Sequence, residues 1–367
     1  MGHWPLTVLE LFLLVFFGCW IIKKIKKRVG PKEIFREFLN LFDPGYFVAI
    51  ALIAAGALIS TILSVDWRTG AGIFKAWILE PIIFSLILAE IIKNKKELRG
   101  IIFSLVAGTV LVAVASLIYK LFGRLTFDGR LSAWYLSPNH LAMYLAPGFI
   151  LAWWGFSIGE DKKQKILFSL AILVLGLALY STFSYGAWLG ILGGALASLA
   201  IAFRAGLVEK KKGIIICLLI STIFLVVGYW QIDSEKLNNL LKFNRSAWQS
   251  RLIVWQSAEK ILESHWLFGV GPGMFQRYYL EYQLFFPVPY LEWAVPQPHN
   301  LFLAWWLQGG LLGLAGFLVL LINYFNNVIL AKQKTPVTPP ASPKKIRGEP
   351  SGILGGKQLL AILLMAD

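Results

Sequence analysis

The polar stretch from 244 to 300 contains two histidines and three arginines, residue types suited to acid–base and anion chemistry. His299 follows Pro298, and an imidazole can accept a proton near neutral pH. Arg251 carries a planar guanidinium, which binds phosphate oxygens in a bidentate manner. A single histidine is also a common structural residue, and arginines commonly pair with carboxylates. The residue types alone leave a catalytic and a structural interpretation open.

Three further polar residues could support such a site. Asn300 is the neighbour of His299. Asn139 follows Pro138 at an expected helix start, where the missing N–H of proline costs nothing. Arg130 lies in the polar segment just before it. The alternative interpretation of Asn139 is an ordinary polar residue at a helix start.

We expect no metal and no cofactor. The histidines lack the helical pair spacing of a metal site, and Cys19 and Cys217 both fall inside apolar runs, which favours buried small residues over a disulfide or a metal cluster. The glycine-rich segment 269–273 lacks the preceding strand of a dinucleotide site and predicts a turn. The four histidines are His3, His140, His265 and His299.

The elements that must position these residues are membrane helices. Hydrophobic residues make up 57% of the chain and the mean hydropathy is +0.66, which excludes an ordinary soluble domain. Apolar runs of about 20 residues, enough to cross about 30 Å of hydrocarbon, predict an all-α polytopic protein with about ten spans. The expected spans are 6–22, 46–63, 73–92, 101–121, 138–157, 166–184, 187–203, 213–231, 299–330 and 353–365.

The distribution of charge predicts which side each loop lies on. If the N-terminus is outside, the five inner segments contain 23 of the 35 lysines and arginines, as the positive-inside rule requires. The net charge of +15 is therefore mostly a topology signal, and we expect no nucleic-acid partner. Arginines are enriched on the outer side, which suggests an anionic ligand there. Ordinary pairing with acidic side chains is the alternative.

The predicted organisation is a transmembrane bundle (1–231), a large outer loop (232–298), a ninth span (299–330), a flexible inner linker (331–352) and the start of a further span (353–367). Within the outer loop, residues 245–264 suit a helix with an apolar stripe, which we expect to lie on the membrane surface. That stripe comprises Trp248, Leu252, Trp255, Ala258 and Leu262. The last span is short, and we expect the natural chain to continue beyond it.

Three ordered blocks resemble the O-antigen ligase and O-antigen polymerase family. The first is Arg130 with Ser137-Pro138-Asn139-His140. The second runs from Ser250-Arg251 through Trp255 to Gly269-Val270-Gly271-Pro272-Gly273. The third is Pro298-His299-Asn300-Leu301 with Gly309-Gly310 and Gly313. The similarity extends over roughly 45–367. A weaker block, Ser184-Tyr185-Gly186, resembles the Ser-Arg-Gly turn of the family but has Tyr185 where the family has arginine, which puts one anion contact of the family in doubt.

The resemblance implies a C-type glycosyltransferase fold in the bacterial inner membrane, with the active site on the outer face. It implies transfer of a glycan from an undecaprenyl-diphosphate carrier to an acceptor hydroxyl, without metal and with inversion. In this interpretation His299 is catalytic, Arg251 and Arg130 bind the diphosphate, and Asn300 and Asn139 support them. The aromatic segment 274–286 could seat the prenyl chain or the sugar rings.

Several alternatives remain open. The acceptor could be a lipid core, another glycan or a protein side chain, and the sequence does not separate ligase, polymerase and protein O-oligosaccharyltransferase. A transporter or flippase of lipid-linked glycans would carry polar residues deep in several spans. The expected spans are mostly apolar, with Lys75 and Glu80 as exceptions, which favours the transferase. A non-catalytic scaffold would tolerate the loss of His299 and Arg251.

Overall fold

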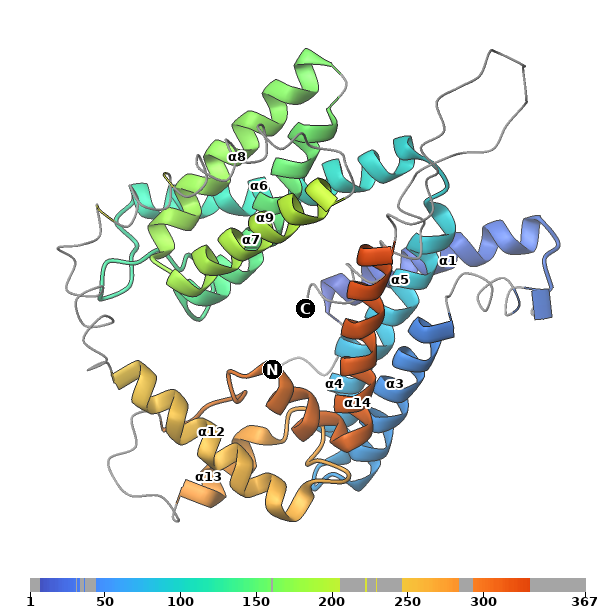
Figure 1. Cartoon of the computed structure of the whole chain (residues 1–367), viewed down its shortest axis with the longest axis vertical. Coiled ribbons are helices and arrows are strands. Elements are labelled where there is room, and N and C mark those ends of the chain that lie inside the picture. Colours follow the sequence, from blue (N-terminus) through green and yellow to red (C-terminus); the bar gives the residue numbers. More distant parts are fainter. Residues whose placement is uncertain are drawn as a thin grey trace. The chain divides into compact units, whose positions relative to one another are not determined.

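The computed structural model describes residues 7–30, 44–159, 161–204, 246–283 and 293–330, together with residues 32, 33, 36, 222 and 229. All regular secondary structure in these ranges is helical, which confirms the expected all-α class (Figure 1). The predicted linker at 331–352 and the last predicted span lie outside the described residues, as does nearly all of the span predicted at 213–231.

Five helical segments in the described part of the chain are long and apolar enough to cross a membrane. They are Pro44–Leu63 (α3), Trp67–Ile91, Lys96–Leu121 within α6 (Lys95–Leu121), Lys162–Thr182 (α8) and Leu301–Asn327 within α14 (Leu301–Leu330). The second segment joins α4 (Trp67–Phe74), the π-helical turn η1 (Lys75–Leu79) and α5 (Glu80–Ile91). Helices α1 (Val8–Lys26), α7 (Pro138–Ile158) and α9 (Tyr185–Arg204) cover three further expected spans. The total of about ten spans stays a prediction.

The described helices form two compact units. Unit 1 contains the described residues up to Ile91 and those from Ser246 to Leu330, and unit 2 contains those from Ile92 to Arg204. Arg251, His299 and Asn300 belong to unit 1, whereas Arg130 and Asn139 belong to unit 2. Each unit is therefore described by itself.

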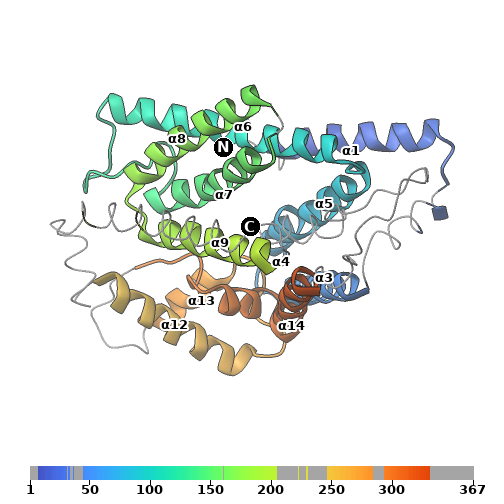
Figure 2. The same cartoon turned by 45° about the horizontal axis from the view of Figure 1, so that its top comes forward.

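In unit 1, α3 and α14 lie side by side in both overall views (Figures 1 and 2). They run antiparallel, because Gly45 lies against Asn323 while Gly56 lies against Gly309 and Gly313. A Cβ built at Gly56 would lie 2.6 Å from the carbonyl oxygen of Gly309, so glycine is what allows this approach. Small residues are typical of such close helix contacts within membranes.

Two ion pairs attach α1 to the segment Trp67–Ile91. Lys75 Nζ lies 2.6 Å from Glu10 Oε1, and Lys24 Nζ lies 2.9 Å from Glu90 Oε1. Trp20 Nε1 adds a hydrogen bond of 3.0 Å to Glu90 Oε2. The earlier residue of α1, Glu10, pairs with the earlier residue of the second segment, Lys75, and the later residue Lys24 pairs with the later residue Glu90. The two segments therefore run parallel. The predicted alternation of spans requires this direction.

In unit 2, α7 packs against α6, α8 and α9. Each of three helices begins at a polar residue whose side chain accepts hydrogen bonds from first-turn amides, Asn94 for α6, Ser137 for α7 and Asp161 for α8. Leu141 and Leu145 of α7 are fully buried. The packing therefore fixes the N-terminal end of α7, where Asn139 and His140 lie.

Candidate active site

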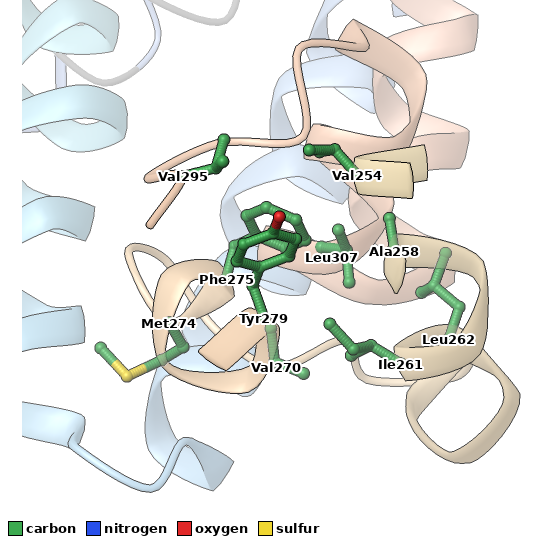
Figure 3. Packing of buried hydrophobic residues seen from close by; sticks show 10 residues of the cluster. All are labelled: Val254, Ala258, Ile261, Leu262, Val270, Met274, Phe275, Tyr279, Val295 and Leu307. Carbon is green, nitrogen blue, oxygen red and sulfur yellow. The ribbon is translucent and has the colours of Figure 1, made fainter. Parts of the chain in front are cut away.

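The site region of unit 1 is built on the buried face of α12 (Ser246–His265). Val254, Ala258, Ile261 and Leu262 are buried in a cluster with residues of the following loop and with Leu307 of α14 (Figure 3). We expected Ala258 and Leu262 to lie on the membrane surface, and that prediction is wrong. Ala258 and Leu262 pack against protein because the loop after α12 folds back over them, whereas Leu252 of the same predicted stripe is 40% exposed.

The aromatic segment after α12 forms much of the same cluster. Phe275 and Tyr279 of α13 (Phe275–Tyr282) are buried (Figure 3). Tyr278 and Tyr282 are partly buried and pack against the cluster. Burial raises the pKa of the Tyr278 hydroxyl above its ordinary value of 10.0, with a smaller contribution from Glu281. The two buried rings hold the loop together, which leaves them no surface for a prenyl chain or a sugar.

The turn at 269–273 forms as predicted and continues into a backbone connection with α14. Gly269, Gly271 and Gly273 all have positive φ, which L side chains rarely adopt. The amides of Val270 and Gly271 donate to the carbonyl oxygen of Leu307, at 2.7 and 3.3 Å. These bonds are possible because α14 is interrupted at Gly310, which has φ 63° and ψ −162°. The break frees the Leu307 carbonyl for the loop.

Arg251 lies at the edge of this buried face. It is three residues before the buried Val254 and follows the buried Ser250, and its own side chain is exposed. The buried neighbours fix the helix turn that carries Arg251. The Arg251 side chain is therefore exposed on a helical turn whose other face is packed against protein.

His299 lies at the entry to α14 in an unusual backbone conformation. Its φ is 51°, one of the few positive values at a non-glycine residue in the described chain. Pro298 before it is buried, and His299 itself is exposed. Asn300 Oδ1 accepts hydrogen bonds from the amides of Phe302 (3.0 Å) and Leu303 (3.3 Å), so Asn300 caps α14. The strained conformation and the cap together determine the position of the His299 backbone.

The segments that carry Arg251 and His299 meet at the cluster. Val254 and Val295 are both members, and Figure 3 shows them on the same side of Phe275 and Tyr279. Val295 is four residues before His299 in the sequence. Arg251 and His299 thus belong to segments packed on one core, and both side chains are exposed.

In unit 2, the fold brings Arg130 and Asn139 together. Arg130 Nη2 donates to Asn139 Oδ1 at 2.8 Å, and Arg130 Nε donates to the carbonyl oxygen of Thr182 at 2.8 Å. Asp128 lies 3.8 Å from Nη1, and the arginine side chain is only 13% exposed. These contacts give Arg130 a structural role, attaching the segment before α7 to the end of α8. Its predicted role in diphosphate binding stays a prediction.

The other described histidines have local contacts. His140 Nδ1 lies 3.0 Å from Ser137 Oγ at the start of α7. His265 Nδ1 lies 3.0 Å from the carbonyl oxygen of Ile261, and its ring meets Tyr278 edge-on. Within the described ranges, there is no group of three or more His, Cys, Asp or Glu side chains arranged to hold a metal ion.

Two long-range hydrogen bonds in these regions were not predicted from the sequence. Trp306 Nε1 donates to the carbonyl oxygen of Trp266 at 2.6 Å, which joins α14 to the end of α12. Lys120 Nζ donates to Ser181 Oγ at 2.8 Å in unit 2. A signal for Lys120 was available, because it is a lysine at the end of a span on the side where the positive-inside rule expects few. The tryptophan pair had no comparable signal.

Comparison with known proteins adds one finding. Residues 170–318 match the family model described as O-antigen ligase. This range contains α12, α13, His299 and the break in α14. A comparison with curated proteins found no match.

Proposed function

We propose that the chain is a member of the O-antigen ligase family, whose model matches residues 170–318, and that it transfers a glycan from an undecaprenyl-diphosphate carrier to an acceptor hydroxyl at the outer leaflet of the bacterial inner membrane. The family suggests a membrane enzyme that moves glycans between a lipid-linked donor and an acceptor. The observation that carries the finer proposal is the packing of the Arg251 and His299 segments on one cluster within the matched range.

In the proposed reaction the acceptor oxygen attacks the anomeric carbon of the donor sugar. The bond between that carbon and the diphosphate oxygen breaks, and the electron pair leaves with undecaprenyl diphosphate. His299 accepts the proton of the acceptor hydroxyl as general base. Because the nucleophile attacks opposite the leaving group, the anomeric configuration inverts.

Arg251 is assigned to the leaving group. A guanidinium binds two phosphate oxygens at once, and its charge offsets the negative charge that develops on the diphosphate. This interaction needs no metal ion, so we propose a metal-independent reaction. Asn300 supports His299 by capping the helix that starts beside it. The acceptor class stays open among lipid core, glycan and protein.

The test is transfer by the purified chain in detergent from a lipid-diphosphate-linked glycan, with chelator present. We expect His299→Ala to lower kcat by about 10²–10⁴-fold, the range of general acid–base catalysis. We expect Arg251→Ala to lower it by about 10²–10³-fold, the cost of removing one charge-stabilising donor. Arg251→Lys should recover only part of this loss, because lysine lacks the planar fork.

Arg277→Ala is the matched control. Arg277 is an exposed arginine of the same loop, and its Nε lies 3.4 Å from Glu281 Oε1. It should transfer within about twofold of the wild type, as expected for an exposed ion pair. Wild-type turnover in folded His299→Ala or Arg251→Ala would overturn the assigned roles. Movement of the intact lipid-linked glycan across a vesicle bilayer, without transfer, would favour the flippase alternative.

A further inference from the structure

The segment that directly follows α12 consists of three exposed apolar residues, here called the apolar tip. Trp266, Leu267 and Phe268 are 52%, 41% and 46% exposed. Their neighbours differ, because Leu262 of α12 and Val270 of the glycine turn are both buried in the cluster (Figure 3). The hydrophobic core of unit 1 therefore stops on either side of the apolar tip.

The backbone of the apolar tip is fixed by α14. Trp306 Nε1 donates to the carbonyl oxygen of Trp266 at 2.6 Å, and the Leu311 amide donates to the carbonyl oxygen of Leu267 at 3.0 Å. These bonds hold the main chain against α14 while the side chains of the tip stay exposed. The exposed apolar surface is thus part of an ordered turn.

The break in α14 places the apolar tip at the level of the last turns of α3. A Cβ built at Gly309 would lie 3.4 Å from the backbone nitrogen of Ala57. A Cβ built at the next residue, Gly310, would lie 2.7 Å from Cα of Phe268. Ala57 is six residues before Leu63, the last residue of α3, and therefore lies about 9 Å from that helix end.

The length of α3 relates this level to the membrane. Its 20 residues extend about 30 Å, which is the thickness of the hydrocarbon core, and none of them is charged. Leu58, which follows Ala57, is 46% exposed, and Ile62 is 66% exposed. A point about 9 Å from the Leu63 end of α3 therefore lies within the hydrocarbon, where exposed side chains meet lipid.

We propose that the apolar tip is inserted into the bilayer leaflet that surrounds the Leu63 end of α3, where its side chains contact the acyl chains of phospholipids. Its surface continues the exposed apolar side of α3 and α14, which includes Leu58 and Leu311, 46% and 40% exposed. The contact would hold the end of α12 at the membrane.

Two further features of the apolar tip suit lipid. Backbone polar groups at membrane depth need hydrogen-bond partners within the protein, and the carbonyl groups of Trp266 and Leu267 have such partners in α14. Tryptophan is also enriched where the hydrocarbon meets the headgroups. The inference uses only the membrane-spanning character of α3 and α14, so it does not depend on the proposed reaction.

The first experiment measures the surroundings of Phe268 in phosphatidylcholine vesicles. Phe268→Cys is made in the full chain with Cys19→Ala and Cys217→Ala, and the new thiol is labelled with bimane. We expect fluorescence to fall when the phosphatidylcholine is brominated near the headgroup end of its acyl chains, and to resist aqueous iodide. Leu58→Cys, at the same level on α3, should give the same pattern.

Glu259→Cys is the matched negative control. Glu259 is an exposed carboxylate of α12, seven residues before Trp266, and a charged side chain is costly to place in hydrocarbon. Its label should be quenched by iodide and not by the brominated lipid. Iodide quenching at Phe268→Cys equal to that at Glu259→Cys would place the tip in water and overturn the proposal. Protection of Phe268→Cys from both quenchers would show a protein partner, another part of the chain or a second copy, and would overturn it as well.

A second measurement uses the wild-type chain. Phosphatidylcholine with a diazirine in one acyl chain is photolysed in the same vesicles, and the labelled residues are identified by mass spectrometry. We expect label on Trp266–Phe268 and on the exposed side of α3. Label on α3 without label on the tip would contradict the proposal. Neither measurement needs a glycan donor, so failed glycan transfer leaves the lipid contact standing, and a tip found in water leaves the proposed function standing.

Discussion

The backbone amide of Leu311 donates its hydrogen bond to the carbonyl oxygen of Leu267, 3.0 Å away. In an unbroken helix this amide would bond to Leu307, four residues before it. The Leu307 carbonyl instead accepts from Val270 and Gly271. In this turn of α14, the Leu311 amide and the Leu307 carbonyl thus form hydrogen bonds with the loop after α12 and not with each other. Backbone bonds and side-chain packing therefore join the Arg251 helix to the helix that begins beside His299.

This exchange requires glycine at 310. A Cβ at Gly310 would overlap the Leu267 carbonyl oxygen, and the positive φ of 63° disfavours any L side chain. We expect Gly310→Ala to lower the free energy of unfolding by about 2 kcal/mol or more, through strain and the loss of these bonds. Thermal denaturation in detergent would measure the loss. Gly100→Ala is the control, since a Cβ there meets no neighbour within 4 Å. Equal melting temperatures for Gly310→Ala and Gly100→Ala would show that the break in α14 does not require glycine at 310.

The α3–α14 contact makes a separate prediction. Gly56→Ala would push a methyl group to within 2.6 Å of the Gly309 carbonyl oxygen, so the helices must separate. Overpacking of this kind costs about 1–3 kcal/mol. Unfolding by SDS titration would report the change. Gly72→Ala, another helical glycine but with open space around it, should match the wild type. Wild-type stability in Gly56→Ala would show that the close contact is not required.

Arg130 makes a prediction about local stability in unit 2. Arg130 reaches the Thr182 carbonyl through Nε and Asn139 through Nη2, and the single nitrogen of Arg130→Lys does not reproduce this planar, two-nitrogen arrangement. We expect a loss of about 1–3 kcal/mol, and a smaller loss in Asn139→Ala, which removes one of the two partners. Hydrogen exchange at the Leu131 amide, which bonds to the Ser181 carbonyl, would detect the loosening. Unchanged exchange in Arg130→Lys would disprove the structural role.

The pair of Lys24 and Glu90 can be tested by exchanging its charges. The Lys24 side chain is only 8% exposed, so Lys24→Glu places two carboxylates together at a largely buried position. Such a change should cost about 3 kcal/mol or more, and limited proteolysis should release α1. The double variant Lys24→Glu with Glu90→Lys restores an ion pair and should recover much of the loss. A double variant no more stable than the single one would show that the pair does not hold α1.

Much of the local structure follows from the order of residues. The apolar run predicted at 46–63 forms α3 (Pro44–Leu63). The run predicted at 166–184 forms most of α8 (Lys162–Thr182) and extends two residues beyond the end of that helix. The turn at 269–273 was predictable because three glycines within five residues allow positive φ. Such features depend on neighbouring residues alone. The O-antigen ligase resemblance, first seen in motifs, is confirmed by the match over 170–318.

The tertiary structure decided where the apolar faces point and which polar groups meet. Hydropathy measures transfer out of water and does not distinguish lipid from protein, so Ala258 and Leu262 were assigned to the membrane surface although they pack in the cluster. The break at Gly310 depends on a loop remote in sequence, whose amides take the place of a helical bond. Arg130 and Asn139 were each chosen for their chemistry, but only the fold brings them to 2.8 Å. Composition and local spacing thus determined the helices, and ordered motifs indicated the family resemblance, while long-range packing decided how the chemical groups are held.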